Sequence, residues 1–341
     1  MDRGLRSVSA ELLFLSAADV RACAPSPGEM LHLVEEVFRA HGQQRARHEK
    51  MHLDLRATHG GHFAAFPAYV DPGSPQEPIV GVKWLANFVD NPGRFGLPAV
   101  TALIVINDLA RGVPLAILEG GYITALRTAA ASAVGARYLA QTPVETIAII
   151  GASAQGREHL MALHHAFRPR QVRVFDVRHE VAHRFVQDFA HHLDLDVTAS
   201  ETCIQAVHGA DVVVLATSAR EPFFEGDWCQ PGMLLIAISG VQDLKAEVLR
   251  RVDRLIVDVL SGEEAPGALG LRPFFARGIL SPDDVDATMA DIVNGRAAGR
   301  EGTGQIILYS PGGLGTEDVA TAHLVYQCAR REGVGTWLTL L

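Results

Sequence analysis

Cysteine is scarce in this chain, and the few cysteines are not paired by spacing. Only four occur in 341 residues: Cys23, Cys203, Cys229 and Cys328. Because no C-x-x-C pair is present, they match neither a disulfide framework nor a zinc knuckle. We therefore expect no metal site and a reducing, cytoplasmic environment.

Long apolar runs and clusters of basic residues are also missing. The longest runs, such as 212–216 and 233–238, are strand-sized and fall far short of the roughly 18 to 20 residues that cross a bilayer. The apolar run 12–15 is too short for a signal peptide. Lysine and arginine total 30 against 39 acidic residues, a net charge of −9, with no basic stripe for a duplex. We expect a soluble, unexported protein that binds neither membranes nor nucleic acid.

The middle of the chain alternates β-rich runs with amphipathic stretches. A composition of 48% hydrophobic and 20% charged residues is that of a globular protein with one large or two moderate domains. Apolar residues at helical spacing in 156–165 and 180–192 predict helices between the strands. This order predicts a Rossmann-type α/β domain, a parallel sheet covered on both faces. We expect its strands at 145–150, 171–176, 212–216, 234–238 and 255–258.

The chain before residue 144 has a different pattern. A helix is expected at 27–42, and turn-rich segments at 71–75 and 90–93 separate β-rich runs. The pattern predicts a hairpin-rich α+β domain. Its strands are expected at 51–55, 62–67, 81–88 and 101–107.

The sharpest local motif is a glycine turn between a strand and a helix. It reads Gly151-Ala-Ser153-Ala154-Gln155-Gly156, and Asp176 ends the next strand 25 residues after Gly151. An acid near that spacing binds the adenosine ribose of NAD and repels the 2′-phosphate of NADP. A plain strand-to-helix turn is the alternative, and Arg178 leaves NADP open. The strand, the helix and Asp176 together favour NAD.

Two cations stand in unusually apolar segments. Lys83 lies in the β-rich run 80–84, where an outward-facing strand lysine is the simpler interpretation from composition. Arg127 lies in the helix-like stretch 124–136, which has few charges and many small residues. Such a cation needs an anion, either a protein carboxylate or a ligand.

One acid follows a predicted strand where open α/β sheets hold their ligands. Asp243 comes shortly after the run 233–238 and near Gly240. A simple helix N-cap before Leu244 explains it about equally well on local grounds.

Together these motifs resemble the ornithine cyclodeaminase/mu-crystallin family, in order and over nearly the whole chain. Within the family, the chain is most similar to members that oxidatively split N-(2-amino-2-carboxyethyl)-L-glutamate. This similarity lies in the segments 306–311 and 334–340 and in Asp243, which follows Ile238-Ser. The matching segments are Gly81–Trp84, Leu126–Ala130, Ile149–Gln155, Asp176, Ile238–Asp243 and Ser310–Asp318.

The resemblance implies roles for single residues. Lys83, Arg127 and a basic residue from 45–56 would hold substrate carboxylates; Arg56 is preferred because it closes the strand at 51–55. Asp243 would be the catalytic acid, and Lys83 would be a second catalytic residue. Cyclodeaminases carry Gly-Asp-Pro-Gly-Lys, whereas this chain reads Gly-Val-Gln-Asp-Leu-Lys over 240–245, which disfavours cyclodeamination. The dinucleotide would be lined by Arg127, Thr128, Gly151, Ser153, Ala154, Gln155, Gly156, Asp176, Thr217, Ser218 and Ser310.

The resemblance also implies a function. We expect an NAD-dependent oxidoreductase that oxidises an amino-acid-derived secondary amine and hydrolyses the imine, giving 2,3-diaminopropionate and 2-oxoglutarate for siderophore or antibiotic synthesis. Alternatives are an ornithine cyclodeaminase-type lyase that makes proline, a related amino-acid dehydrogenase, and a mu-crystallin-like ligand-binding protein. The retention of Lys83, Arg127 and Asp243 together argues for catalysis, because a pure binder needs no acid.

The C-terminus completes the expected domain organisation. A strand at 305–309 and a helix from 316 to 331, with an acidic first turn, are expected to pack on the N-terminal domain. We assign 1–125 and 305–341 to a substrate-binding and dimerisation domain and 126–304 to the NAD-binding domain. A homodimer through the N-terminal hairpins would cover their strand edges.

Overall fold

The computed structural model describes residues 11–73, 77–189, 193, 195–238, 241–260 and 271–340. The expected turn residues Ser74 and Pro75, the helix end at 190–192 and the motif residues 239–240 lie outside this description. The chain folds into two units, each made of segments that are distant in sequence. Unit 1 comprises 1–26, 44–124 and 314–341, and unit 2 comprises 27–43 and 125–313.

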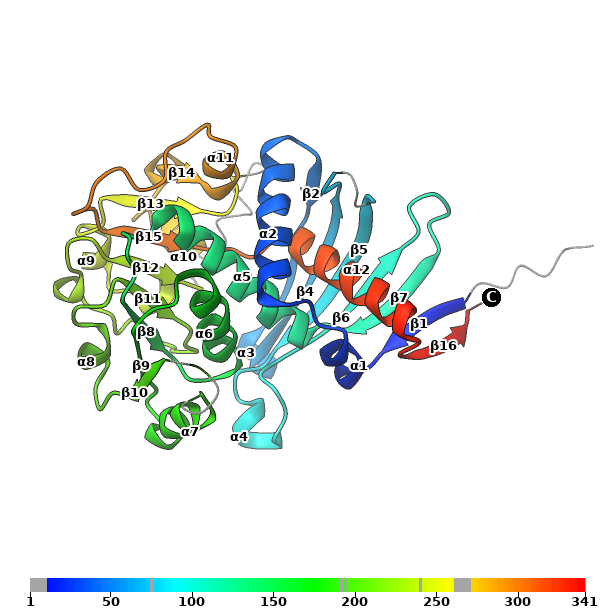
Figure 1. Ribbon diagram of the computed structural model, residues 1–341, viewed down its shortest axis with the longest axis horizontal. Helices are drawn as coiled ribbons and strands as arrows, with labels where there is room; N and C mark the ends of the chain where they lie inside the picture. Colours follow the sequence, from blue (N-terminus) through cyan, green and yellow to red (C-terminus); the bar gives the residue numbers. More distant parts are fainter. Residues whose placement is uncertain are drawn as a thin grey trace, which may run out of the picture. The chain divides into compact units, whose positions relative to one another are not determined.

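Unit 1 is built on a mixed eight-stranded sheet (Figure 1). Its order is β16-β1-β7-β6-β5-β4-β2, and β3 pairs with β4. The strands are β1 (Glu11–Leu15), β2 (Ala46–His48), β3 (Met51–Leu55), β4 (Gly61–Val70), β5 (Ile79–Asn87), β6 (Val100–Asn107), β7 (Pro114–Glu119) and β16 (Thr336–Thr339). The helices are α1 (Ala17–Ala22), α3 (Arg56–His59), α4 (Asn91–Phe95) and α12 (Gly315–Glu332). The expected antiparallel hairpins are confirmed.

Helix α12 covers one face of this sheet, over β4, β5 and β6 (Figure 1). The Leu314 N–H donates to the Glu317 carboxylate at 3.1 Å, and the helix ends at Gly333 with a φ of 68°. An acid at the first turn and a left-handed glycine at the end both favour these boundaries. A side chain at Gly315 would press on Phe66 and Ala68, so glycine permits the close approach of α12 to β4.

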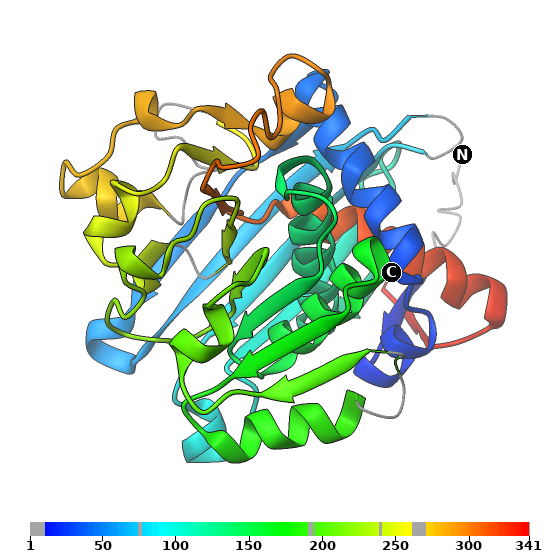
Figure 2. The same cartoon turned by 60° about the vertical axis from the view of Figure 1, so that its left-hand side comes forward.

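Unit 2 contains a second sheet of eight strands, and all its neighbouring strands run parallel (Figure 2). Its order is β10-β9-β8-β11-β12-β15-β13-β14. The strand order reverses at β8, which lies between β9 and β11; ligands of open α/β sheets bind at such a switch point. The strands are β8 (Thr146–Ile150), β9 (Gln171–Phe175), β10 (Asp196–Ala199), β11 (Val212–Leu215), β12 (Leu234–Ala237), β13 (Arg254–Val257), β14 (Ala287–Thr288) and β15 (Ile307–Ser310).

The predicted Rossmann-type architecture is confirmed. All residues of β11 and β12 are apolar and buried, as expected for strands covered on both faces. The predicted connecting helices are present as α6 and α7. The helices of unit 2 are α2 (Pro27–Gly42), α5 (Gly121–Leu139), α6 (Ala154–Phe167), α7 (His179–Phe189), α8 (Cys203–Val207), α9 (Ala246–Leu249), α10 (Arg272–Ala276) and α11 (Met289–Val293). No helix of the described residues is long and apolar enough to cross a membrane.

Two expected domain boundaries need correction. Strand β15 was assigned to the N-terminal domain, but it lies between β12 and β13 in the sheet of unit 2. Helix α2 was also assigned there, but it belongs to unit 2, where Arg39 donates to the Val293 carbonyl at 3.3 Å and the Tyr138 hydroxyl donates to Glu35 at 2.8 Å. Both segments join unit 2 through partners distant in sequence, which local pattern does not reveal.

Candidate active site

The glycine turn of unit 2 lies at the switch point of the parallel sheet. Gly151 has a φ of 105°, and a side chain there would collide with the Ala216 carbonyl that follows β11. A side chain at Gly156 would collide with the Gly151 carbonyl and press on Ile149. Glycine is therefore required at both positions, one for the turn and one for the contact of α6 with β8.

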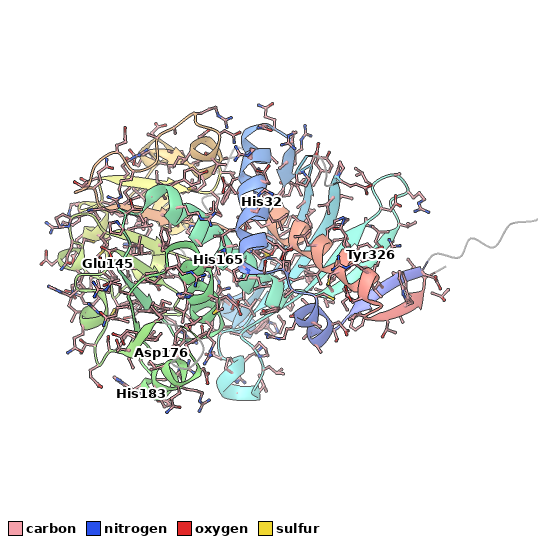
Figure 3. All side chains as sticks on the ribbon, viewed as in Figure 1. His32, Glu145, His165, Asp176, His183 and Tyr326 are labelled. Atoms are coloured by element: carbon pink, nitrogen blue, oxygen red, sulfur yellow. The ribbon has the colours of Figure 1, made fainter. Side chains whose placement is uncertain are left out.

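Asp176 follows directly after β9, the second strand of this motif, and is labelled in Figure 3. Its carboxylate accepts the Ala152 N–H at 3.0 Å and the Arg178 N–H at 3.0 Å. The Arg178 guanidinium lies 3.5 Å from the same carboxylate and is more than half exposed. The predicted acid thus stands beside the turn that would cradle a pyrophosphate, where a ribose would lie.

Three buried polar atoms that belong to predicted site residues of unit 2 have no hydrogen-bond partner among the residues that the structure describes. They are Gln155 Oε1, Ser310 Oγ and Asp243 Oδ2. A buried polar atom without a partner costs free energy, so such atoms indicate a bound ligand. All three residues were predicted to line the cofactor or to catalyse. Together with the glycine turn, which suits phosphates, and Asp176, which suits a ribose, their polar atoms fit a dinucleotide.

Asp243 combines burial with an unusual proton affinity. Its side chain is fully buried, and the Thr217 hydroxyl donates to Oδ1 at 3.0 Å. Burial raises the pKa of the carboxyl from 3.8 to about 6, while the hydrogen bond from Thr217 opposes this rise. A carboxyl with a pKa near neutrality and one unpartnered oxygen is suited to proton transfer. The predicted helix N-cap is not its role, because α9 begins only at Ala246.

Arg127 lies on α5 and is only 7% exposed. Its guanidinium fills the space beside Gly313, where any side chain would collide with it. The Gly313 N–H donates to Asp258 at 2.8 Å, and the Tyr309 hydroxyl donates to the other oxygen of that carboxylate at 2.5 Å. Asp258 therefore joins the end of β15, where Ser310 lies, to the loop at Gly313. This loop packs on Arg127.

Of the other predicted cofactor residues, Thr128 is buried on α5 next to Arg127. Ser153 and Ala154 are exposed at the start of α6, and Ser218 is exposed after β11. All of them belong to unit 2, as the resemblance implied.

Lys83 is buried in unit 1 and paired with an acid. Its ammonium lies 2.6 Å from the Asp318 carboxylate of α12, and both side chains are 1% exposed. It also donates to the Thr124 hydroxyl at 3.5 Å and lies 4.7 Å from the centre of the Phe66 ring. The simpler sequence interpretation, an outward-facing lysine, is therefore wrong.

Arg56 does not share these surroundings. Its side chain is 69% exposed and binds Asp54, with an Nη2 to Oδ2 distance of 2.6 Å. This pairing lowers the pKa of the Asp54 carboxyl. Lys50 lies at the aromatic ring that Lys83 also contacts: its ammonium is 5.7 Å from the centre of the Phe66 ring. The geometry thus favours Lys50 over Arg56 within the segment 45–56.

Comparison with known proteins places these motifs in a family. The model of the ornithine cyclodeaminase/mu-crystallin family matches residues 11–333. The chain belongs to this family. Among curated family members, the alanine dehydrogenase of Archaeoglobus fulgidus is 31% identical over 96% of this chain and 98% of its own length. The N-((2S)-2-amino-2-carboxyethyl)-L-glutamate dehydrogenase of Staphylococcus aureus is 27% identical over 97% and 99%.

Solved family structures share the fold. The Δ1-pyrroline-2-carboxylate reductase of Thermococcus litoralis, in complex with NADH and L-proline, has a TM-score of 0.87 and 31% identity, covering 95% of this chain and 99% of that one. An archaeal alanine dehydrogenase dimer with bound NAD has a TM-score of 0.86 and 29% identity, covering 97% and 100%.

Sequence reasoning did not assign roles to three residues that the structure brings to these sites. Asp318 pairs with Lys83, Lys50 lies at the same aromatic ring, and Asp258 holds Tyr309 and Gly313. Asp318 had a visible signal as an acid in the first turn of the last helix. Asp258 ends an apolar strand, as Asp176 does, but carries no motif of its own.

Proposed function

We propose that this family member is an NAD-dependent oxidoreductase that acts on the CH–NH bond of an amino-acid-derived secondary amine and hydrolyses the imine. The observation that supports this proposal most is the buried Asp243 carboxyl in a nucleotide-binding fold. Its pKa is raised to about 6, and one of its oxygens has no hydrogen-bond partner among the described residues. Relatives named as two amino-acid-type dehydrogenases and a Δ1-pyrroline-2-carboxylate reductase support the reaction class. The proposed substrate is N-(2-amino-2-carboxyethyl)-L-glutamate, which the Staphylococcus aureus relative is named for.

In the proposed reaction, the carbon that bears the amine loses a hydride and the nitrogen releases a proton to solvent, which leaves a C=N bond. Water adds to that carbon, and the C–N bond breaks to release 2-oxoglutarate and 2,3-diaminopropionate. When bound, NAD supplies the hydride acceptor.

The chain's own residues would then orient the substrate and move protons. Lys83 and Arg127 bind carboxylates, so that the carbon is held in one orientation. Asp243 is mostly ionised above its pKa of about 6, so it accepts the proton of the attacking water and returns it to the leaving nitrogen. Gly151, Gly156 and Asp176 hold the dinucleotide.

We further propose a homodimer formed through unit 1. The sheet face opposite α12 carries a cross-strand row of large apolar side chains, because Met51 pairs with Ala65, Ala65 with Trp84, and Trp84 with Leu103. Met51 is 59% exposed, and Trp84 and Leu103 are each 47% exposed. An apolar sheet face of this kind suits an interface between copies. A structural relative is an alanine dehydrogenase dimer.

Turnover assays test the activity. Purified enzyme is mixed with NAD and a panel of amino acids and N-linked amino-acid adducts, and NADH absorbance is recorded together with 2-oxoglutarate release. We expect equimolar NADH and 2-oxoglutarate from N-(2-amino-2-carboxyethyl)-L-glutamate. Ammonia release from ornithine without net NADH would assign the lyase reaction instead, and ligand binding without any turnover would assign a binding protein.

A further inference from the structure

The face of the unit 1 sheet that carries Lys83 is organised in cross-strand rows. In the first row Phe66 pairs with Lys83, and the ammonium groups of Lys50 and Lys83 lie 5.7 and 4.7 Å from the Phe66 ring. Directly opposed residues of antiparallel strands point to the same face. This row is the cationic part of the face, where the proposed function puts a substrate carboxylate.

The second row contains a histidine, an alanine and a leucine. His52 on β3 pairs with Ala64 on β4, and Ala64 pairs with Leu85 on β5. The His52 ring lies 6.1 Å from Phe66, at its edge, so it borders the cationic row. Ala64 is 1% exposed, and its methyl group is the smallest side chain of this row.

The third row ends the face with polar groups. Asp54 pairs with His62, and His62 pairs with Asn87. The His62 ring lies 5.9 Å from His52. The Asp54 carboxylate is bound by Arg56, so it is compensated by a neighbouring cation.

One atom of the third row indicates a ligand. Asn87 Oδ1 is buried and has no hydrogen-bond partner within the described parts of the chain. An amide oxygen in this position needs a donor such as an ammonium group. Burial, together with Arg56, lowers the pKa of His62, so its ring is neutral near pH 7 and offers one N–H donor to an acceptor such as a carboxylate.

We propose that His52, His62 and Asn87 form a distal subsite for a second amino-acid head group of the substrate. The two histidines donate to its carboxylate, and Asn87 Oδ1 accepts from its ammonium group. This inference rests on the proposed function, in which Lys83 binds the first carboxylate, and it narrows the substrate class to secondary amines that join two amino-acid groups.

The spacing of the rows agrees with such a substrate. Adjacent rows on one face are separated by two residues, or about 7 Å along the strands. In a secondary amine that joins two amino acids through one methylene, five bonds separate the two carboxyl carbons, which are about 6 Å apart when extended. A carboxylate at Lys83 therefore places the second one near His52. A short amino acid such as alanine does not reach this row.

The test compares two substrates in matched variants. The full substrate is N-(2-amino-2-carboxyethyl)-L-glutamate, and the truncated one is N-ethyl-L-glutamate, which lacks the distal head group. The variants are His52→Ala, His62→Gln and Asn87→Ala. The control is His59→Ala, an exposed histidine of α3 that bonds only to Thr58 in the described structure. NADH formation gives kcat and KM, and titration of NAD gives cofactor affinity.

We expect His52→Ala to lower kcat/KM for the full substrate roughly 10- to 100-fold, as for a lost hydrogen bond to a charged group. The value for the truncated substrate and the NAD affinity should change less than about 2-fold, as in the control. His62→Gln, which keeps a donor, should lose less than His52→Ala. Equal losses on both substrates, or no loss on either, would overturn the distal subsite. A wild-type enzyme that forms NADH from neither substrate would instead contradict the proposed function.

Discussion

The ammonium group of Lys83 and the carboxylate of Asp318 lie 2.6 Å apart, and both side chains are almost completely buried. Because each charge is removed from water, each depends on the other for compensation. Lys83 lies on β5, and Asp318 lies in the first turn of α12. If a substrate carboxylate binds Lys83 as proposed, Asp318 would be the residue that orients the lysine.

Replacement of Lys83 is expected to affect both stability and turnover. Lys83→Met leaves Asp318 buried without its cation, which should cost about 3 to 5 kcal/mol in denaturant unfolding. The double variant Lys83→Met with Asp318→Leu should recover much of this stability but none of the turnover. As a control, Arg111→Ala breaks an exposed ion pair and should change stability by less than about 1 kcal/mol. Normal turnover in Lys83→Met would remove this lysine from the substrate site.

Arg127 and Lys83 should differ in their effect on the cofactor. Arg127 is in the nucleotide-binding unit, so Arg127→Ala should weaken NAD binding as well as lower kcat/KM. Lys83→Ala should leave NAD affinity nearly unchanged and lower only kcat/KM. Fluorescence titration with NADH, alongside steady-state kinetics, separates the two. Unchanged NADH affinity in Arg127→Ala would mean that Arg127 does not bind the cofactor, and would leave it only a role in substrate binding.

Asp176 should determine the choice between NAD and NADP. Asp176→Ala removes the carboxylate that would repel a 2′-phosphate, while Arg178 remains next to it, so we expect the preference for NAD to fall by at least about 10-fold. The comparison is kcat/KM with each nucleotide, with Asp188→Ala, a partly exposed acid of α7, as control. Equal wild-type affinity for NAD and NADP would contradict the role of Asp176.

Asp243 should give the enzyme a pH dependence near 6. Its pKa is raised by burial, so the native state binds a proton more tightly than the unfolded chain. The contribution to stability is therefore full below about pH 4 and is lost as the pH rises through about 6. The difference between 3.8 and about 6 corresponds to about 3 kcal/mol. Asp243→Asn should be more stable than the wild type at pH 8 by up to about that amount.

The same ionisation should appear in catalysis. If the Asp243 carboxylate is the base, as proposed, kcat/KM of the wild type should rise through about pH 6 and level off above it. Asp243→Asn should lose at least about 100-fold in kcat and show no such rise, whereas Asp227→Asn, an exposed acid, should behave like the wild type. A variant that keeps the wild-type profile would exclude Asp243 as the base.

A charge on the open face of unit 1 should dissociate the proposed dimer. Trp84 and Phe63 stack on this face with ring centres 5.5 Å apart. Trp84→Glu or Leu103→Glu would bury charges in the interface and should shift sedimentation from dimer to monomer at micromolar concentration. Leu109→Glu, an exposed leucine in the turn after β6, serves as control. A wild-type monomer under these conditions would remove the dimer proposal.

The nucleotide-binding half could be predicted well because its determinants are local. Strand β8, the glycine turn and helix α6 are contiguous in sequence. Gly156 is required by contacts within this segment, and Gly151 is required by its left-handed turn and by the end of the neighbouring strand β11. Helix 27–42 and the strand at 51–55 match prediction at both ends for the same reason, since hydrophobic period and turn residues are local. Knowing where a helix or strand begins and ends in the sequence, however, did not reveal which distant segments it packs against.

The sequence by itself determined the two fold types, the glycine turn with Asp176, and the set of charged residues that need partners. Tertiary structure alone decided which partners they have. It brought Asp318 to Lys83, placed Lys50 rather than Arg56 at Phe66, and inserted β15 between β12 and β13. The physical reason is that a buried charge needs a counter-charge and a strand needs neighbouring strands. Which residue or strand fills that place depends on contacts between segments far apart in the chain.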